Sequence, residues 1–178
     1  MTQTGAPPDP TNLDQERLDI LEALRAQRGF LRYTVQGLSD EEASRPTTVS
    51  QLCLGGLIKH VADVEASWAQ FVLEGPAAMA GFDEAAMAAH ADSFRMLEGE
   101  TLEGLLAAYE EVAARTDQLV ASLPSLDVSH PLPEAPWFPP GAHRSARRAF
   151  MHIVAETAQH SGHADILREA LDGQKTMG

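Results

Sequence analysis

Cysteine, aromatic residues and long apolar runs are scarce in this sequence of 178 residues. The only cysteine is Cys53, so no disulfide can form within the chain. Aromatic residues make up 6%, and β-branched runs are short, which argues against a fold built from sheets. No apolar run reaches the roughly 18 residues of a membrane-spanning helix, and the start, MTQTGAPPDP, does not resemble a signal peptide. We therefore expect a soluble cytoplasmic protein.

Basic residues are also few: 13 Lys and Arg stand against 26 Asp and Glu, and the formal net charge is -13 at pH 7. Binding to nucleic acid depends on Lys and Arg side chains that displace counterions from phosphates, and anionic membrane surfaces attract basic segments. The charge therefore argues against both kinds of partner. It is compatible with a small anionic substrate, because a few arginines can gather in one pocket.

Residues that favour helices are abundant, and apolar residues recur at helical spacing in four long segments. We expect long helices at residues 11–37, 49–74, 101–122 and 143–172, with a shorter helix at 83–97. Four long helices in one small domain predict an all-α four-helix bundle. This single domain is expected to cover residues 11–173, after a mobile Pro-rich tail at 1–10.

Local signals mark several of the expected helix ends. The stretches SDEE at Ser39–Glu42 and TVSQ at Thr48–Gln51 are typical of capping boxes. Gly37 and Gly173 suit the positions that follow helix C-termini, and Gly75, with a proline after it, should end the second long helix. These signals place the boundaries of the helices to within a few residues.

The segment before the last long helix is rich in proline. Residues 124–143 contain six prolines, which predicts one long irregular loop. A loop of this length inside a compact domain is often functional. Trp137 in this loop and Trp68 on the second long helix could line a pocket, although packing is the more common role for each.

The last predicted helix carries the stretch ETAQHSGH, which places one carboxylate and two imidazoles close together. At about 100° per residue, His160 lies within the apolar stripe of this helix and Glu156 lies at its border. Buried charge is costly unless it is paired or bound to a metal ion. The two side chains could therefore hydrogen-bond to each other or to a neighbouring helix, or they could hold a metal ion. His163 and His152 turn further toward solvent, and whether either joins the site stays open.

A histidine on the second long helix extends this pair to a set of three ligands. His60 lies next to the apolar stripe of its helix, and two facing helices of a bundle can bring it to Glu156 and His160. Gly55 and Gly56, just before it, could allow a close approach between helices. Two histidines and a glutamate suit Zn²⁺, Ni²⁺ or Fe²⁺, with positions left for water or substrate. The alternative is a polar seam in a bundle without metal.

Two stretches resemble the DinB-like superfamily: GGLIKHVADVEASW in the second long helix and HIVAETAQHSGHADILREALDG in the last. The likeness extends from about residue 12 to residue 173 and is closest to the uncharacterised branch that contains the mini-circle proteins. Relatives include mycothiol-dependent maleylpyruvate isomerase and S-transferases that use mycothiol or bacillithiol. The resemblance implies a four-helix bundle, commonly a homodimer, with a divalent metal ion held by three side chains.

The ligand positions of this superfamily map onto His60, Glu156 and His160. Many relatives have histidine at the position of Glu156, whereas the mycothiol-dependent isomerase has glutamate there, as this chain does. The resemblance implies one divalent metal ion, with zinc first and nickel or iron as alternatives. It also implies transfer of a low-molecular-weight, mycothiol-like thiol to a small electrophile. No segment matches a known thiol-binding or substrate-binding motif, so no catalytic residue is identified.

Two other functions stay open on the sequence alone. A metal-dependent hydrolase would use metal-bound water and would need a general base nearby, and a non-catalytic bundle would bind or sense a small ligand. Arg144, Arg147 and Arg148 could bind carboxylates of a thiol or substrate, or they could pair with the acidic surface. Asp63 and Asp165 are candidates for orienting the histidines.

Overall fold

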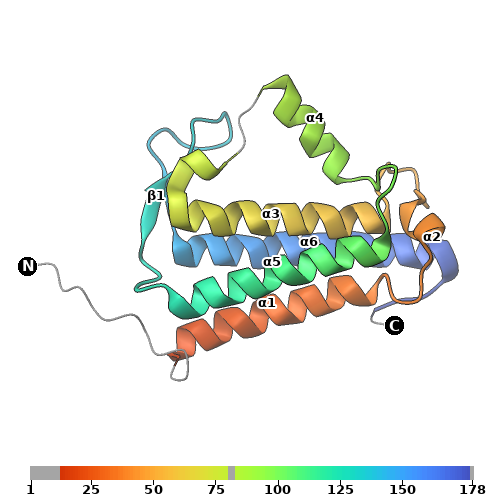
Figure 1. Ribbon diagram of the computed structural model, residues 1–178, viewed down its shortest axis with the longest axis horizontal. Coiled ribbons are helices and arrows are strands. Elements are labelled where there is room, and N and C mark those ends of the chain that lie inside the picture. Colours follow the sequence, from red (N-terminus) through yellow and green to blue (C-terminus); the bar gives the residue numbers. More distant parts are fainter. Residues whose placement is uncertain (1–12, 80–82, 177–178) are drawn as a thin grey trace, which may run out of the picture.

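Four long helices form the body of the molecule, as the sequence predicts. In the computed structural model, which describes residues 13–79 and 83–176, they are α1 (Gln15–Tyr33), α3 (Leu54–Glu74), α5 (Leu102–Ser122) and α6 (Ala146–Asp172). The four helices lie side by side (Figure 1); α3 packs on both α5 and α6, and α1 packs on α6. The predicted all-α bundle is therefore confirmed. The tail predicted at 1–10 lies outside the described residues.

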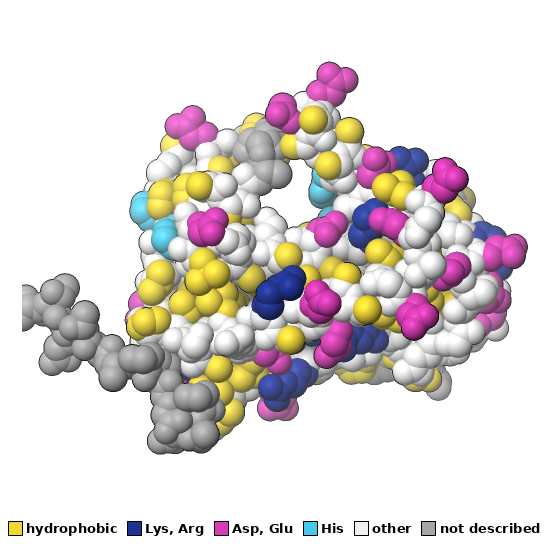
Figure 2. Space-filling view, viewed as in Figure 1, with side chains coloured by type: hydrophobic (Ala, Val, Ile, Leu, Met, Phe, Trp, Pro, Cys, Tyr) yellow, Lys and Arg dark blue, Asp and Glu magenta, His cyan; other side chains and the backbone are white. Residues whose placement is uncertain are grey.

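Shorter elements connect the long helices. They are α2 (Asp40–Ser44), the 3₁₀ helix η1 (Gly75–Ala78), α4 (Glu84–Ser93), β1 (Ser129–Pro131) and β2 (His143–Ser145). α4 stands at a slant over α3, and its C-terminal end returns to the beginning of α3 (Figure 1). The space-filling view shows an opening between α4 and the body of the molecule (Figure 2). β1 and β2 pair antiparallel, with Ser129 opposite Ser145. The Pro-rich connection, predicted as wholly irregular, is therefore closed at its base by a short ribbon.

Three of the predicted helix ends are confirmed. Ser39 Oγ accepts a hydrogen bond from the backbone N–H of Glu42 (3.3 Å), and the Glu42 carboxylate accepts one from the backbone N–H of Ser39 (2.9 Å), which completes the capping box of α2. Gly75, with φ of 72°, ends α3. Gly173 follows α6 with φ of 82°, a conformation that glycine adopts without steric strain.

Two other predicted ends are wrong. α3 begins at Leu54, later than expected, because the Thr48 hydroxyl accepts a hydrogen bond from the backbone N–H of Ser50 (3.2 Å) in a local turn. Side-chain hydrogen bonds of this kind compete with helix formation. Gly37, with φ of 75°, lies in the turn beyond α1 rather than directly at its end.

The core has an apolar cluster toward each end of the bundle and buried polar side chains between them. Arg28 on α1 donates two hydrogen bonds to Glu65 on α3 (2.6 and 3.1 Å) and one to Asp117 on α5 (2.7 Å). Glu65 is completely buried. His60 and His160 also belong to these buried polar residues. No described helix is long and apolar enough to cross a membrane.

Candidate metal centre

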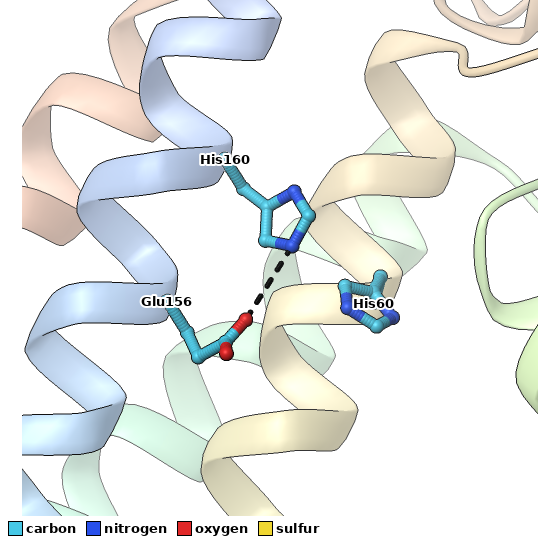
Figure 3. A group of neighbouring side chains, drawn as sticks. All are labelled: His60, Glu156 and His160. Atoms are coloured by element: carbon cyan, nitrogen blue, oxygen red, sulfur yellow. Dashed lines mark ion pairs between the residues drawn. The ribbon is translucent and has the colours of Figure 1, made fainter. Parts of the chain in front are cut away.

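The three side chains predicted as metal ligands lie together between α3 and α6 (Figure 3). His60 projects from α3, and Glu156 and His160 project from α6, four residues apart. Each side chain offers one ligand atom, and these atoms all lie within 4.8 Å of one another. His160 Nε2 is 3.6 Å from Glu156 Oε2, and the rings of His60 and His160 are 4.8 Å apart between centroids. The three groups therefore converge on one point.

Both imidazoles are buried, whereas the carboxylate is partly open to solvent. His60 is 4% exposed and His160 is 8% exposed, but the side chain of Glu156 is 28% exposed. Burial, with the nearby charges of His160 and His90, lowers the pKa of His60 to about 4. Burial, and then the charge of His163, lowers the pKa of His160. Both rings are therefore neutral at pH 7, the form in which an imidazole nitrogen binds a metal ion.

A hydrogen-bond chain from α4 fixes the proton of His60. Ser93 Oγ donates to the backbone carbonyl of His90 (2.7 Å). Since the hydroxyl proton is used there, the same oxygen accepts from His60 Nδ1–H, which is 2.9 Å away. This tautomer leaves Nε2 of His60 unprotonated and able to bind a metal ion. Phe94 stacks on the His60 ring, with 3.8 Å between centroids, and holds its orientation.

Two glycines of α3 make room for the segment that follows α4. A Cβ atom on Gly56 would lie 2.0 Å from the carbonyl oxygen of Phe94, and one on Gly55 would lie 2.2 Å from the sulfur of Met96. The sequence predicts a close approach at these glycines, but between helices. The structure shows that the close neighbour is the chain between α4 and α5. Because Gly56 has no side chain, this segment can bring Phe94 onto the ring of His60.

The donor set fits a divalent metal ion. Ligand atoms on one Zn²⁺ ion, each at about 2.0–2.2 Å, lie within roughly 4 Å of one another. The ligand atoms here lie within 4.8 Å of one another, so small rotations of the side chains would close the site. Two imidazole nitrogens and one carboxylate oxygen suit zinc, nickel or iron and leave further coordination positions open.

His152 and His163 flank the three candidate ligands. His152 Nε2 is 3.5 Å from Glu156 Oε1, and its ring is packed against Trp68, with 4.7 Å between centroids. The sequence places His152 toward solvent, whereas the structure half-buries it. His163 is exposed, as expected, and its Nδ1 is 3.5 Å from Nδ1 of His160. Each of the two contacts a candidate ligand without joining the cluster of ligand atoms.

Several other residues that the sequence singles out lie in ordinary surroundings. The Asp165 carboxylate accepts hydrogen bonds from Thr176, and Asp63 is exposed on α3. Ser93, rather than either aspartate, is therefore the orienting group seen at His60. Cys53 is 2% exposed and therefore buried. The side chain of Trp137 is 64% exposed.

The residues that the sequence reasoning missed come from α4 and its end. They are His90, Ser93 and Phe94, which surround the ring of His60. The sequence of α4, EAAMAAHADS, has no apolar stripe that would predict which face packs on the bundle. A histidine followed three residues later by a serine is too common a pattern to indicate a site.

One protein-family model, described as Mycothiol-S-transferase, matches residues 19–173. The matched segment contains α3 and α6 in full, and with them His60, Glu156 and His160. No curated protein matches the chain.

Proposed function

The chain belongs to the mycothiol S-transferase family, a DinB-like family, and we propose that it transfers a low-molecular-weight, mycothiol-like thiol to a small electrophile with one divalent metal ion as cofactor. Zinc is the first candidate for this ion, and nickel and iron are the alternatives. One observation carries the proposal: His60, Glu156 and His160 converge from two helices in a member of a thiol-transferase family.

A metal ion in this cluster would lower the pKa of a thiol that coordinates it, so that a thiolate nucleophile is available at neutral pH. The protein keeps the ligands ready for the ion. Ser93 and Phe94 fix the tautomer and plane of His60, and the Glu156 carboxylate supplies negative charge. Burial keeps His60 and His160 neutral, so neither ring has to release a proton before it binds the ion.

The proposed reaction forms one S–C bond. The thiol loses its proton, and the sulfur attacks the electrophilic carbon. In a substitution the leaving group departs with its electron pair; in an addition the neighbouring carbon takes up a proton. His163 and His90 are exposed and lie beside the ligand histidines, with ring centroids 5.4 Å from His160 and 5.5 Å from His60. These two imidazoles are our candidates for accepting the thiol proton.

Metal content and thiol transfer test this proposal together. Protein purified without a tag or chelator should contain near-stoichiometric divalent metal by mass spectrometry. It should also join mycothiol to 1-chloro-2,4-dinitrobenzene. His60→Ala and His160→Ala should each lose the metal ion and the activity. His152→Ala is the control: it should keep the metal ion, because His152 contacts only the Glu156 carboxylate among the candidate ligands.

Two results would contradict the proposal. If the parent protein takes up no Zn²⁺, Ni²⁺ or Fe²⁺, the cluster is a polar seam rather than a metal site. If His152→Ala empties the site while His60→Ala does not, the ligand assignment is wrong. Hydrolysis of ester or amide substrates without added thiol would support the hydrolase alternative in place of thiol transfer.

We also propose, from the family likeness, that the protein is a cytoplasmic homodimer. Exposed apolar side chains on α6, such as Met151 (57% exposed) and Ile166 (61% exposed), could contribute to a dimer contact. Light scattering after size-exclusion chromatography should give about twice the chain mass of 19.2 kDa. A monomer at micromolar concentration would contradict the dimer.

A further inference from the structure

A row of side chains on α6 leads away from the candidate metal ligands toward the Pro-rich connection. His160, Glu156, His152 and Arg148 follow one another at intervals of four residues, from buried to exposed, so each lies next to the following one on the helix surface. Arg144, on β2, continues the same interval. Along the helix axis, Arg148 is about 12 Å from Glu156. That distance is the length of a small molecule that has a reactive carbon at one end and a charged group at the other.

Aromatic contacts connect this row to the metal centre. His152 Nε2 lies 3.5 Å from Glu156 Oε1, and the His152 ring packs edge-on against Trp68. The Arg144 guanidinium lies 4.5 Å from the centroid of the same Trp68 ring. It also lies 5.6 Å from the centroid of Phe138, in the Pro-rich connection. Arg144 is therefore held between two aromatic rings, in continuous contact with the ligand cluster.

The charges of Arg144 and Arg148 have no carboxylate partner among residues 13–79 and 83–176. Nη1 of Arg144 is buried and makes no hydrogen bond there. Burial, and then the charge of Arg148, lowers the pKa of Arg144. Arg147, between the two, behaves differently, because it pairs with both Glu16 and Asp127. In a chain with 26 Asp and Glu, two neighbouring arginines without carboxylate partners indicate a site for an external anion.

We propose that Arg144 and Arg148 form a subsite that binds a carboxylate group of the electrophilic substrate. A guanidinium presents paired N–H donors that match a carboxylate, and a guanidinium already stacked on aromatic rings loses little freedom on binding. The substrate class is therefore a small electrophile with a carboxylate at the end remote from its reactive carbon. This inference rests on the proposed thiol transfer for the role of the bound molecule, but the subsite itself can be tested without it.

Binding of a matched pair of ligands tests the subsite directly. The probes are 4-chloro-3-nitrobenzoate and its neutral amide, titrated by calorimetry into metal-loaded protein without thiol, so that no transfer occurs. The parent should bind the acid more tightly than the amide. Arg144→Gln and Arg148→Gln should each weaken binding of the acid by roughly tenfold, the effect of losing a charge-assisted hydrogen bond. Neither variant should change binding of the amide.

Arg147→Gln is the matched control, since it removes the same charge from the same helix end. It should leave binding of both ligands unchanged, because the Arg147 guanidinium is engaged by Glu16 and Asp127. Arg148 is exposed, so its substitution tests the subsite even if Arg144→Gln perturbs folding. Equal binding of acid and amide to the parent would overturn the proposal. So would an equal loss of acid binding in Arg147→Gln, or no loss in Arg148→Gln.

A kinetic comparison separates the failure of this inference from the failure of the proposed function. With mycothiol added, the acid should show a lower KM than the amide, and Arg148→Gln should remove that difference. Transfer to both ligands with equal KM would overturn the subsite and leave thiol transfer standing. Arginine-dependent binding of the acid without any transfer would support the subsite and overturn the proposed thiol transfer.

Discussion

The position of one proton determines whether His60 can act as a ligand. Ser93 Oγ uses its own proton on the His90 carbonyl and accepts the Nδ1 proton of His60. Ser93→Ala should therefore release the ring to rotate and to exchange tautomers. Loss of the hydrogen-bond partner of a metal-binding histidine typically lowers metal affinity by about 10–100-fold. We expect a loss in that range for Ser93→Ala, measured by competition with a chromophoric chelator.

The control for this prediction is His90→Ala, which keeps the backbone carbonyl that accepts from Ser93. Its metal affinity should stay within about threefold of the parent, because the tautomer-fixing chain is intact. If Ser93→Ala binds metal as tightly as the parent does, the hydroxyl does not prepare His60. If His90→Ala loses as much affinity as Ser93→Ala does, the imidazole of His90 matters more than the hydroxyl.

Single residues on regular helices were predictable from the sequence. His60, Glu156 and His160 lie on long helices with clear apolar stripes, so the periodicity shows which face each occupies. Periodicity and bundle packing allow the three to converge, and it was the family resemblance that predicted them as one ligand set; the structure brings them together. Ser93 was not predictable in this way, because it lies at the end of a helix without an apolar stripe. Its neighbour His60 is 33 residues away in the chain.

Among the elements, α4 reaches the site because two glycines, Gly55 and Gly56, follow the first residue of α3. A Cβ on Gly56 would lie 2.0 Å from the Phe94 carbonyl oxygen and 2.3 Å from its carbon. These are backbone atoms that cannot rotate away. Gly56→Ala should therefore displace the segment after α4, with a cost of about 1–3 kcal/mol in the free energy of unfolding. Metal affinity should fall as well, since Phe94 and Ser93 would move away from His60.

Gly29→Ala on α1 is the matched control for this prediction, because a Cβ at Gly29 would meet no atom within 4 Å. Alanine favours a helix over glycine by about 0.5–1 kcal/mol, so this variant should be slightly more stable than the parent. Urea unfolding of both variants measures the difference. A stabilised Gly56→Ala protein with normal metal content would show that the close approach is not needed.

The long helices were more predictable than the short elements. Apolar periodicity over 20 or so residues averages out local ambiguity, and it located α1, α3, α5 and α6. The sequence predicts the start of α3 too early, because the hydroxyls of the preceding segment are typical of helix caps but form hydrogen bonds within a turn. The strands β1 and β2 have three residues each, too few for an alternating pattern to be recognised.

Across the whole molecule, a buried charge cluster holds three of the long helices at a fixed relative rotation. Arg28 on α1 is paired with Glu65 on α3 and with Asp117 on α5, and the side chains of Arg28 and Glu65 are 4% and 0% exposed. The sequence does not predict this pairing, because it depends on how three separate helices rotate against one another. Glu65 follows His60 by five residues on α3, so the charge cluster and the metal centre share this helix at positions about 7.5 Å apart along its axis.

Substitutions at this cluster should show strong coupling. Arg28→Met leaves the Glu65 carboxylate buried without its partner, which should cost about 3–5 kcal/mol in the free energy of unfolding. The double variant Arg28→Met/Glu65→Leu removes both charges and should recover a large part of that loss, because an apolar pair can fill the same space.

Arg25→Met is the control for this prediction. Arg25 also pairs with Asp117, but its side chain is 66% exposed, so the cost in the free energy of unfolding should stay below about 1 kcal/mol. Urea unfolding of these variants, and of the single variant Glu65→Leu, measures these costs. If the double variant is as unstable as the sum of its single changes, the two charges act independently, and the cluster does not couple α1 to the helix that carries His60.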